Sequence, residues 1–192
     1  MVFGFFKRRQ REQAAYALYG ALVAQSRQPE FYLHLGIADT VDGRFDMIAL
    51  HAALVIRRVQ GQPDDGPPTA QFLFDIMFAD MDRNLREMGV GDLSVGKHVK
   101  RMAKAYYGRA AAYEEGLQGD EETLIAALTR NLYRKSEPEP WQVAAIAAYV
   151  RRSAELLAQQ DYQALGQGTM TFAPLAGFLA PPAAGRPSDP QE

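Results

Sequence analysis

The segment GDLSVGK at residues 91–97 has the glycine and lysine spacing of a phosphate-binding P-loop. In such a loop, backbone N–H groups hold a nucleotide phosphate, and a serine or threonine after the lysine binds Mg²⁺. This chain has His98 at that position, and the residues before the segment follow a helical rather than a strand pattern. The sequence therefore favours a turn between two helices, in which Gly89 ends the first and Asp92 or Ser94 caps the second.

Two groups of aspartates are the next candidates for chemistry. They are Asp39, Asp42 and Asp46 in one group and Asp75, Asp80 and Asp82 in the other. On facing helices such groups can bind Mg²⁺ and a diphosphate, because Mg²⁺ prefers oxygen ligands. Arginines accompany both groups, however, and opposite charges three or four residues apart on a helix can pair directly. The sequence favours no metal site and a structural ion-pair network of Asp39, Asp42, Arg44, Asp46, Asp80, Asp82, Arg83 and Arg86.

The histidines and the absence of cysteine restrict the remaining chemistry. His34, His51 and His98 are far apart and form no HExxH or similar metal-binding motif. His51 lies near the apolar face of its helix, which is typical of a hydrogen-bonded core histidine. Without cysteine there is no disulfide, thiolate metal site or cysteine nucleophile, and no nucleophile-elbow motif is present. We expect no catalytic residues and no cofactor, and therefore a protein that is not an enzyme.

A group of cations follows the P-loop-like segment. A helix predicted over residues 94–115 carries Lys97, Lys100, Arg101, Lys104 and Arg109 on one side, with no acidic residue between Leu93 and Tyr113. The whole chain has a formal charge of −2, so this group stands out locally. Such a surface can meet ribosomal RNA, anionic lipid or an acidic partner, or it can be a solvated helix face. We predict that Lys97, Lys100, Arg101 and Lys104 bind a partner.

The N-terminus combines aromatic and basic residues. These are Phe3, Phe5 and Phe6, followed by Lys7, Arg8 and Arg9. The apolar run is too short for a signal peptide or a membrane span, and no transit peptide precedes it. Residues 1–9 are a candidate for peripheral contact with an anionic membrane; alternatively, the phenylalanines fold back on the domain. A bacterial protein in the cytoplasm, peripheral on the inner face of the cytoplasmic membrane, is the expected setting.

The elements that position these residues are helices. Apolar residues recur at three- and four-residue steps, and no segment shows sustained two-residue alternation. Helices are predicted over residues 10–25, 40–58, 72–88, 94–115, 120–135 and 141–157, with a short one after Pro29. Thr40 or Asp42, Thr69 and Asp120 are the expected caps. The predicted fold is an all-α, single-domain bundle of six or seven helices, arranged around residues 72–102, with flexible ends.

The chain of 192 residues is long enough for one domain with an adequate core. We place that domain at residues 10–172, with residues 166–172 lying extended across the bundle. Residues 173–192 are rich in proline, alanine and glycine, and we expect a flexible tail there because the segment cannot bury enough apolar surface to order itself.

Two blocks of this chain resemble a known family. LGIADTVDGRFDMIALHAALVIRRV at residues 35–59 and LFDIMFADMDRNLREMGVGDLSVGKHVKRM at residues 73–102 are similar to the signature regions of the ubiquinol-cytochrome c chaperone family. The resemblance implies a helical, non-enzymatic assembly factor for the respiratory complex that contains cytochrome b. Mitochondrial members bind newly made cytochrome b and work near the ribosome with a small partner protein.

The resemblance leads to a specific expectation for this chain. We expect a chaperone that receives newly made cytochrome b at the membrane face, with the ribosome or a small protein as further partners. A groove of methionine and aromatic side chains would shield the apolar client. The alternatives from other classes are a helical RNA- or ribosome-binding module and, with less support, a Mg²⁺-dependent enzyme that uses the aspartate groups.

Overall fold

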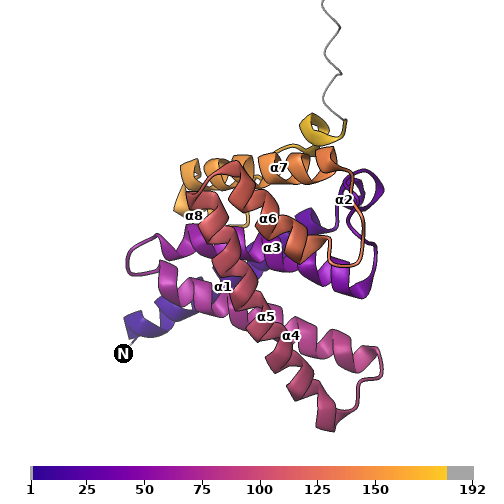
Figure 1. The fold of residues 1–192 in the computed structure, drawn as a ribbon. Coiled ribbons are helices and arrows are strands. Elements are labelled where there is room, and N and C mark those ends of the chain that lie inside the picture. Colours follow the sequence, from indigo (N-terminus) through magenta and orange to yellow (C-terminus); the bar gives the residue numbers. More distant parts are fainter. Residues whose placement is uncertain (1, 181–192) are drawn as a thin grey trace, which may run out of the picture.

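The computed structural model describes the backbone of residues 2–180 and the side chains of residues 6–180. The fold is all-α, as predicted, and the described residues contain no strand (Figure 1). Within residues 2–180, the six longer helices are α1 (Val2–Ser26), α3 (Val41–Gln60), α4 (Gly66–Glu87), α5 (Asp92–Gln118), α6 (Glu121–Leu132) and α7 (Pro140–Gln159). The short helices are α2 (Pro29–Leu33), α8 (Tyr162–Gly166) and the 3₁₀ helix η1 (Leu175–Phe178). No helix among the described residues is both long and apolar enough to span a membrane.

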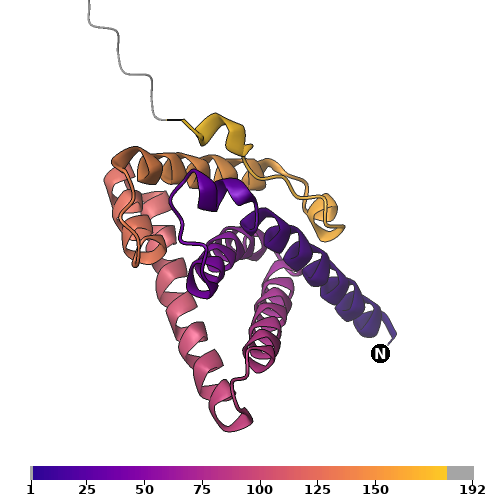
Figure 2. The same ribbon diagram turned by 90° about the vertical axis from the view of Figure 1, so that its right-hand side faces the viewer.

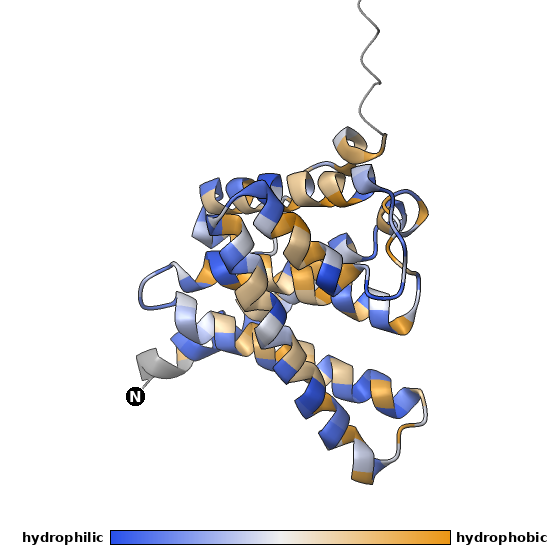
Figure 3. Ribbon diagram, in the orientation of Figure 1, coloured by the Kyte–Doolittle hydropathy of each residue, from blue (hydrophilic) through white to orange (hydrophobic). Residues whose placement is uncertain are grey.

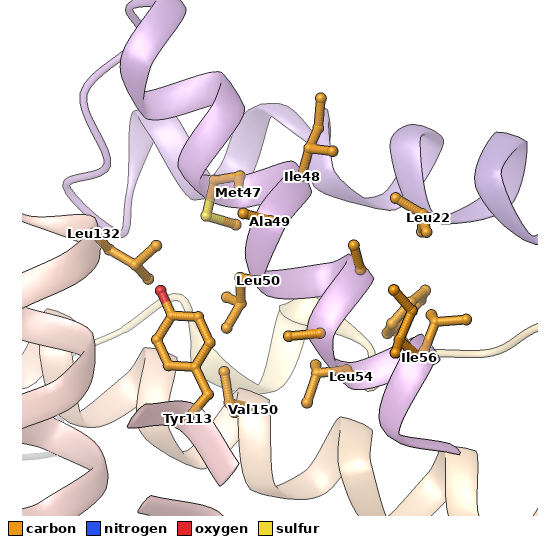
Figure 4. Packing of buried hydrophobic residues seen from close by; sticks show 14 of the residues in the cluster. Leu22, Met47, Ile48, Ala49, Leu50, Leu54, Ile56, Tyr113, Leu132 and Val150 are labelled. Carbon is orange, nitrogen blue, oxygen red and sulfur yellow. The ribbon is translucent and has the colours of Figure 1, made fainter. Parts of the chain in front are cut away.

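Helix α3 is the centre of the fold. It contacts α1, α4, α5, α6 and α7, and it is buried almost continuously from Phe45 to Ile56. Figure 4 shows Leu50 of α3 facing Tyr113 and Val150, with Ile48 on the opposite side of the helix. A helix that is apolar around its whole circumference must be covered on all sides. Each fully buried leucine adds about 1.5–3 kcal/mol to the free energy of unfolding. The expectation that residues 72–102 form the centre is therefore wrong.

Helices α4 and α5 form a hairpin that projects from the rest of the domain (Figures 1 and 2). The turn between them contains Gly89 at φ +86°, a left-handed conformation that ends α4. The predicted turn between two helices is confirmed, and no strand precedes residues 91–97 as a P-loop requires. Neither predicted cap forms. Asp92 is the first residue of α5, and the Ser94 hydroxyl donates to the Gly91 carbonyl oxygen instead of accepting from the helix.

The other predicted caps give mixed results. The Thr40 hydroxyl accepts the Gly43 N–H at the start of α3, and the Asp120 carboxylate accepts the Thr123 N–H at the start of α6. Both caps are confirmed. Thr69 is not a cap, because α4 already begins at Gly66 with prolines in its first turn, where their fixed φ favours the helix.

Both ends of the domain extend beyond the predicted limits. Helix α1 begins at Val2 rather than near residue 10. At the other end, residues 173–180 do not form a tail. The Ala173 N–H donates to the Ser153 hydroxyl at 3.1 Å, Leu175 is buried, and the Phe178 ring meets Tyr149 edge-on. These contacts bury the few apolar side chains of this segment against α7, which offsets its loss of chain entropy. The remainder of the expected tail lies outside the described residues.

Gly43 occupies a position without room for a side chain. It is buried in the first turn of α3, and an added Cβ would lie 2.0 Å from the Ala38 carbonyl oxygen. We expect Gly43→Ala to lower the free energy of unfolding by about 1–3 kcal/mol, measured by urea denaturation, because the backbone must move apart. The control is Gly20→Ala on the exposed side of α1, where a Cβ meets nothing within 4 Å. The free energy of unfolding of Gly20→Ala is expected to rise by about 0.5–1 kcal/mol. Equal changes in the free energy of unfolding for the two variants would show that Gly43 is not in close contact with the Ala38 carbonyl oxygen.

Candidate functional site

An apolar groove lies where the α4–α5 hairpin meets the start of α3. Its apolar lining is Val41, Phe45, Ile48, Met81, Leu85, Met88 and Met102, which we call the methionine groove. The cavity has a volume of about 290 Å³. Three of the seven methionines of the chain line it. Val41 and Met88 are 62% and 51% exposed, so the groove is open to a binding partner.

Helical spacing positions these side chains. The Thr40 cap fixes the start of α3, so that Val41, Phe45 and Ile48 fall on one side at steps of four and three residues. The same steps align Met81 and Leu85 of α4 with Met88 directly after the helix, and α5 adds Met102. Because a thioether side chain is flexible and polarizable, such a lining adapts to apolar partners of different shape. The groove is therefore suited to holding apolar side chains.

Polar residues form the rim of the groove. Arg27, Arg44, Asn84 and Glu87 also line the cavity. Arg44 donates to the Asp39 carboxylate at 2.6 Å, as the sequence predicts, and this hydrogen bond lowers the pKa of Asp39. The groove thus has an apolar floor and a polar rim.

The other predicted ion pairs form, although they do not make one network. Arg86 pairs with Asp82 at 2.6 Å and also with Asp92, and Arg83 lies 4.0 Å from Asp80. Asp42 pairs with Lys135, 93 residues away, rather than with an arginine of its own helix. Among the residues that the structure describes, no three acidic or histidine side chains come together in a way that would hold a metal ion. Asp39, Asp42 and Asp82 are instead paired with Arg44, Lys135 and Arg86.

Asp46 is the centre of a buried charge cluster that sequence reasoning missed. Its carboxylate lies 2.8 Å from Arg109 and 2.7 Å from Arg134, and both Asp46 and Arg109 are buried. Burial raises the pKa of Asp46, while the hydrogen bond from Arg134 and the charge of Arg109 oppose that rise. The Tyr113 hydroxyl is also buried there without a hydrogen-bond partner among the described residues. The prediction that Arg109 lies with the lysines on the exposed basic side of its helix is therefore wrong.

The helical step explains that error. Arg109 follows Lys104 by five residues, which turns it about 140° away from the other cations around α5, whereas residues three or four apart stay aligned. The spacing alone could have separated it from Lys97, Lys100, Arg101 and Lys104. These four residues, which we call the basic stripe, are all exposed. The Arg101 guanidinium donates to His98 Nδ1 at 2.8 Å, and the three lysines have no ion pair with any described residue.

The N-terminal candidates lie at the beginning of α1, far from the groove along the chain. Lys7, Arg8 and Arg9 are exposed, and Phe6 is 63% exposed. The side chains of Phe3 and Phe5 lie outside the described residues. The start of α1 lies away from the outer end of the α4–α5 hairpin in both views of the fold, so the N-terminal cations and the basic stripe do not form one site (Figures 1 and 2).

Comparison with known proteins identifies the family. The family model described as ubiquinol-cytochrome C chaperone matches residues 33–172. The chain is 25% identical to ubiquinol-cytochrome-c reductase complex assembly factor 1 of Xenopus laevis over 148 residues, covering 77% of this chain and 74% of that protein. The protein of the same name from Mus musculus is 26% identical over 144 residues, which are 75% of this chain and 49% of the mouse protein.

A solved structure shares the fold. The crystal structure of the Cbp3 homolog from Brucella abortus superposes with a TM-score of 0.80 at 33% sequence identity, covering 93% of this chain and 99% of that chain. Both blocks on which the resemblance rests lie within residues 33–172, which the family model matches. Since the family model also covers well over half of the sequence, this chain belongs to the ubiquinol-cytochrome c chaperone family, whose named relatives are complex assembly factors.

Proposed function

We propose that this protein assists assembly of the ubiquinol-cytochrome c reductase complex by holding an apolar segment of newly made cytochrome b in the methionine groove. The relatives are named as assembly factors of that complex, which supports the general role. The observation that carries the specific role is the open groove with three methionines. Its volume of about 290 Å³ accommodates a few apolar side chains, as a chaperone that must release its client requires.

The location follows from the client. Cytochrome b is a membrane protein, so the chain works at the inner face of the cytoplasmic membrane, near the ribosome that makes the client. The exposed cations Lys7, Arg8 and Arg9 at the start of α1 support a weak peripheral contact there, because each cation near an anionic surface adds about 1 kcal/mol. A small partner protein, as in mitochondrial members, is part of the same proposal.

The test compares strains with altered copies of the gene. A strain that lacks the gene is expected to lose the cytochrome b signal in a reduced-minus-oxidised haem spectrum of its membranes, and the intact gene is expected to restore it. Val41→Gln combined with Met88→Gln is expected to restore little, because losing two apolar contacts weakens client binding by about thirtyfold. Both positions are more than half exposed, so the variant is expected to fold normally.

The matched control is Leu33→Gln. Leu33 is 75% exposed on α2 and does not line the methionine groove. It is expected to restore the full signal. A normal spectrum in the deletion strain would refute the assembly role, whereas a normal spectrum with the groove variant alone would refute only the groove as the client site.

A further inference from the structure

The tip of the α4–α5 hairpin exposes apolar side chains far from the core. Met88 is 51% exposed, and Leu93, in the first turn of α5, is fully exposed. Both views of the fold show this turn projecting beyond the other helices (Figures 1 and 2). Moving these side chains from water into an apolar phase or against an apolar partner would be favourable. The tip therefore has the character of a surface that another phase or molecule covers.

The basic stripe continues directly from this tip. Leu93, Lys97, Lys100 and Lys104 follow one another at steps of four, three and four residues, which places them along one side of α5. Arg101 lies beside them. At 1.5 Å per residue, the stripe extends about 16 Å from the apolar tip up the hairpin. Figure 3 shows hydrophobic residues at the α4–α5 turn and hydrophilic ones farther along α5.

Few negative charges oppose this stripe. Asp92 at the tip is paired with Arg86, which also pairs with Asp82. Glu87 is exposed and has no ion pair with any described residue, so it is the main opposing charge at the turn. Over residues 82–104 the hairpin carries six cations, Arg83, Arg86 and the four of the basic stripe, against the three carboxylates of Asp82, Glu87 and Asp92, so its outer half is positively charged.

We infer that the α4–α5 hairpin binds an anionic lipid bilayer, with Met88 and Leu93 entering the interface and the basic stripe meeting the lipid phosphates. An apolar end followed by cations matches the order of a membrane surface, in which the acyl region lies beneath the charged head groups. RNA would use the cations but would leave Leu93 exposed. The contact is a second membrane site, distinct from residues 1–9, and it does not depend on the client or on the proposed assembly role.

Sedimentation with lipid vesicles tests this contact. The purified chain is expected to sediment with vesicles of phosphatidylcholine and phosphatidylglycerol, to remain in solution with phosphatidylcholine alone, and to dissociate as salt is raised. Lys100→Gln with Lys104→Gln is expected to weaken binding by about 25-fold, or fivefold for each cation. Leu93→Gln is expected to weaken it by about tenfold. The N-terminal cations are unchanged in every variant, so their contribution to vesicle binding is the same throughout.

The controls are matched to these variants. Arg130→Gln with Arg152→Gln removes two exposed cations on α6 and α7, outside the hairpin and the groove, and Leu33→Gln removes an exposed leucine on α2. Neither is expected to change vesicle binding by more than about twofold. Equal losses in control and hairpin variants would show that binding follows net charge or hydrophobicity alone, and the hairpin contact would be wrong.

A labelled chain gives a direct readout. Because the chain has no cysteine, Leu93→Cys provides a single site for an environment-sensitive fluorophore, and Leu33→Cys provides its control. Anionic vesicles are expected to shift the emission to the blue for the label at position 93 only. If the chain instead binds single-stranded RNA through the basic stripe and gives no blue shift with vesicles, the stripe is an RNA surface and the lipid contact is refuted.

Discussion

Replacing Asp46 with alanine is expected to lower the free energy of unfolding by about 3–5 kcal/mol. The substitution leaves the buried Arg109 guanidinium without its counter-charge, and an unpaired buried charge is among the most costly defects in a folded protein. It also removes the partner of Arg134. The loss is measured by urea denaturation, and in a domain of this size it corresponds to a fall in melting temperature of roughly 10 °C.

Two further variants separate charge burial from general disruption. Asp39→Ala breaks the exposed pair with Arg44 and is expected to change stability little, since water screens exposed charges. The double variant Asp46→Leu with Arg109→Met is expected to be more stable than Asp46→Ala, because no charge is then left buried without a partner. If the double variant is as unstable as the single one, lost packing rather than the unpaired arginine causes the defect.

Acid is expected to destabilise the fold through His51. His51 Nδ1 lies 2.8 Å from the Met47 carbonyl oxygen and His51 Nε2 lies 2.8 Å from the Tyr149 hydroxyl, which confirms the predicted core histidine. The neutral ring satisfies both contacts when Nδ1 donates and Nε2 accepts. Burial lowers the pKa of His51 from 6.5 to about 4, because the surrounding Phe31 and Phe172 rings cannot solvate an imidazolium.

The sign of the pH effect follows from that pKa. The unfolded chain takes up the proton near pH 6.5, whereas the folded chain takes it up only near pH 4. The contribution of His51 to stability is therefore complete above pH 6.5 and is lost as the pH falls from 6.5 to about 4. We expect this residue to account for a loss of about 3 kcal/mol by pH 4.

The comparison with His51→Gln isolates this effect. Urea denaturation at several pH values is expected to give a smaller decline for the variant between pH 6.5 and pH 4, because glutamine does not titrate. The carboxylates that also titrate near pH 4 are the same in both chains. Parallel stability curves for the two proteins would mean that His51 takes up a proton in the folded state as easily as in the unfolded one.

The groove and the hairpin surface belong to the same structural unit. Helices α4 and α5 supply four apolar residues of the methionine groove, Met81, Leu85, Met88 and Met102, and α5 also carries the basic stripe. Met88 belongs to both surfaces. If both proposals hold, contact of the hairpin with lipid brings the groove close to the bilayer into which the client is inserted. The groove variant changes Met88 and so alters both surfaces, whereas Lys100→Gln with Lys104→Gln alters the basic stripe alone. Vesicle binding by the groove variant, measured beside its haem spectrum, therefore separates loss of client binding from loss of lipid contact.

The sequence by itself determined the helices and the family. A helix depends on residues three and four apart, so its periodicity can be read locally, and the predictions for α3, α6 and α7 needed no knowledge of their neighbours. Caps at Thr40 and Asp120 were predictable for the same reason, as was the pair of Asp82 with Arg86 four residues apart. Arg44 was expected to pair with a nearby carboxylate, but its partner Asp39 lies five residues back, before α3 begins. The two family blocks together pointed to the chaperone family that the comparisons show.

Only the tertiary structure decided which residues act together. Arg134 reaches Asp46 across 88 residues, and the methionine groove takes its lining from three helices. The same holds for the central position of α3 and for the ordering of residues 173–180 on α7. Such contacts depend on how the helices pack, because apolar burial is non-directional and does not specify its partners along the chain. The local pattern thus predicted the elements, and packing decided the groove, the buried charges and the exposed hairpin.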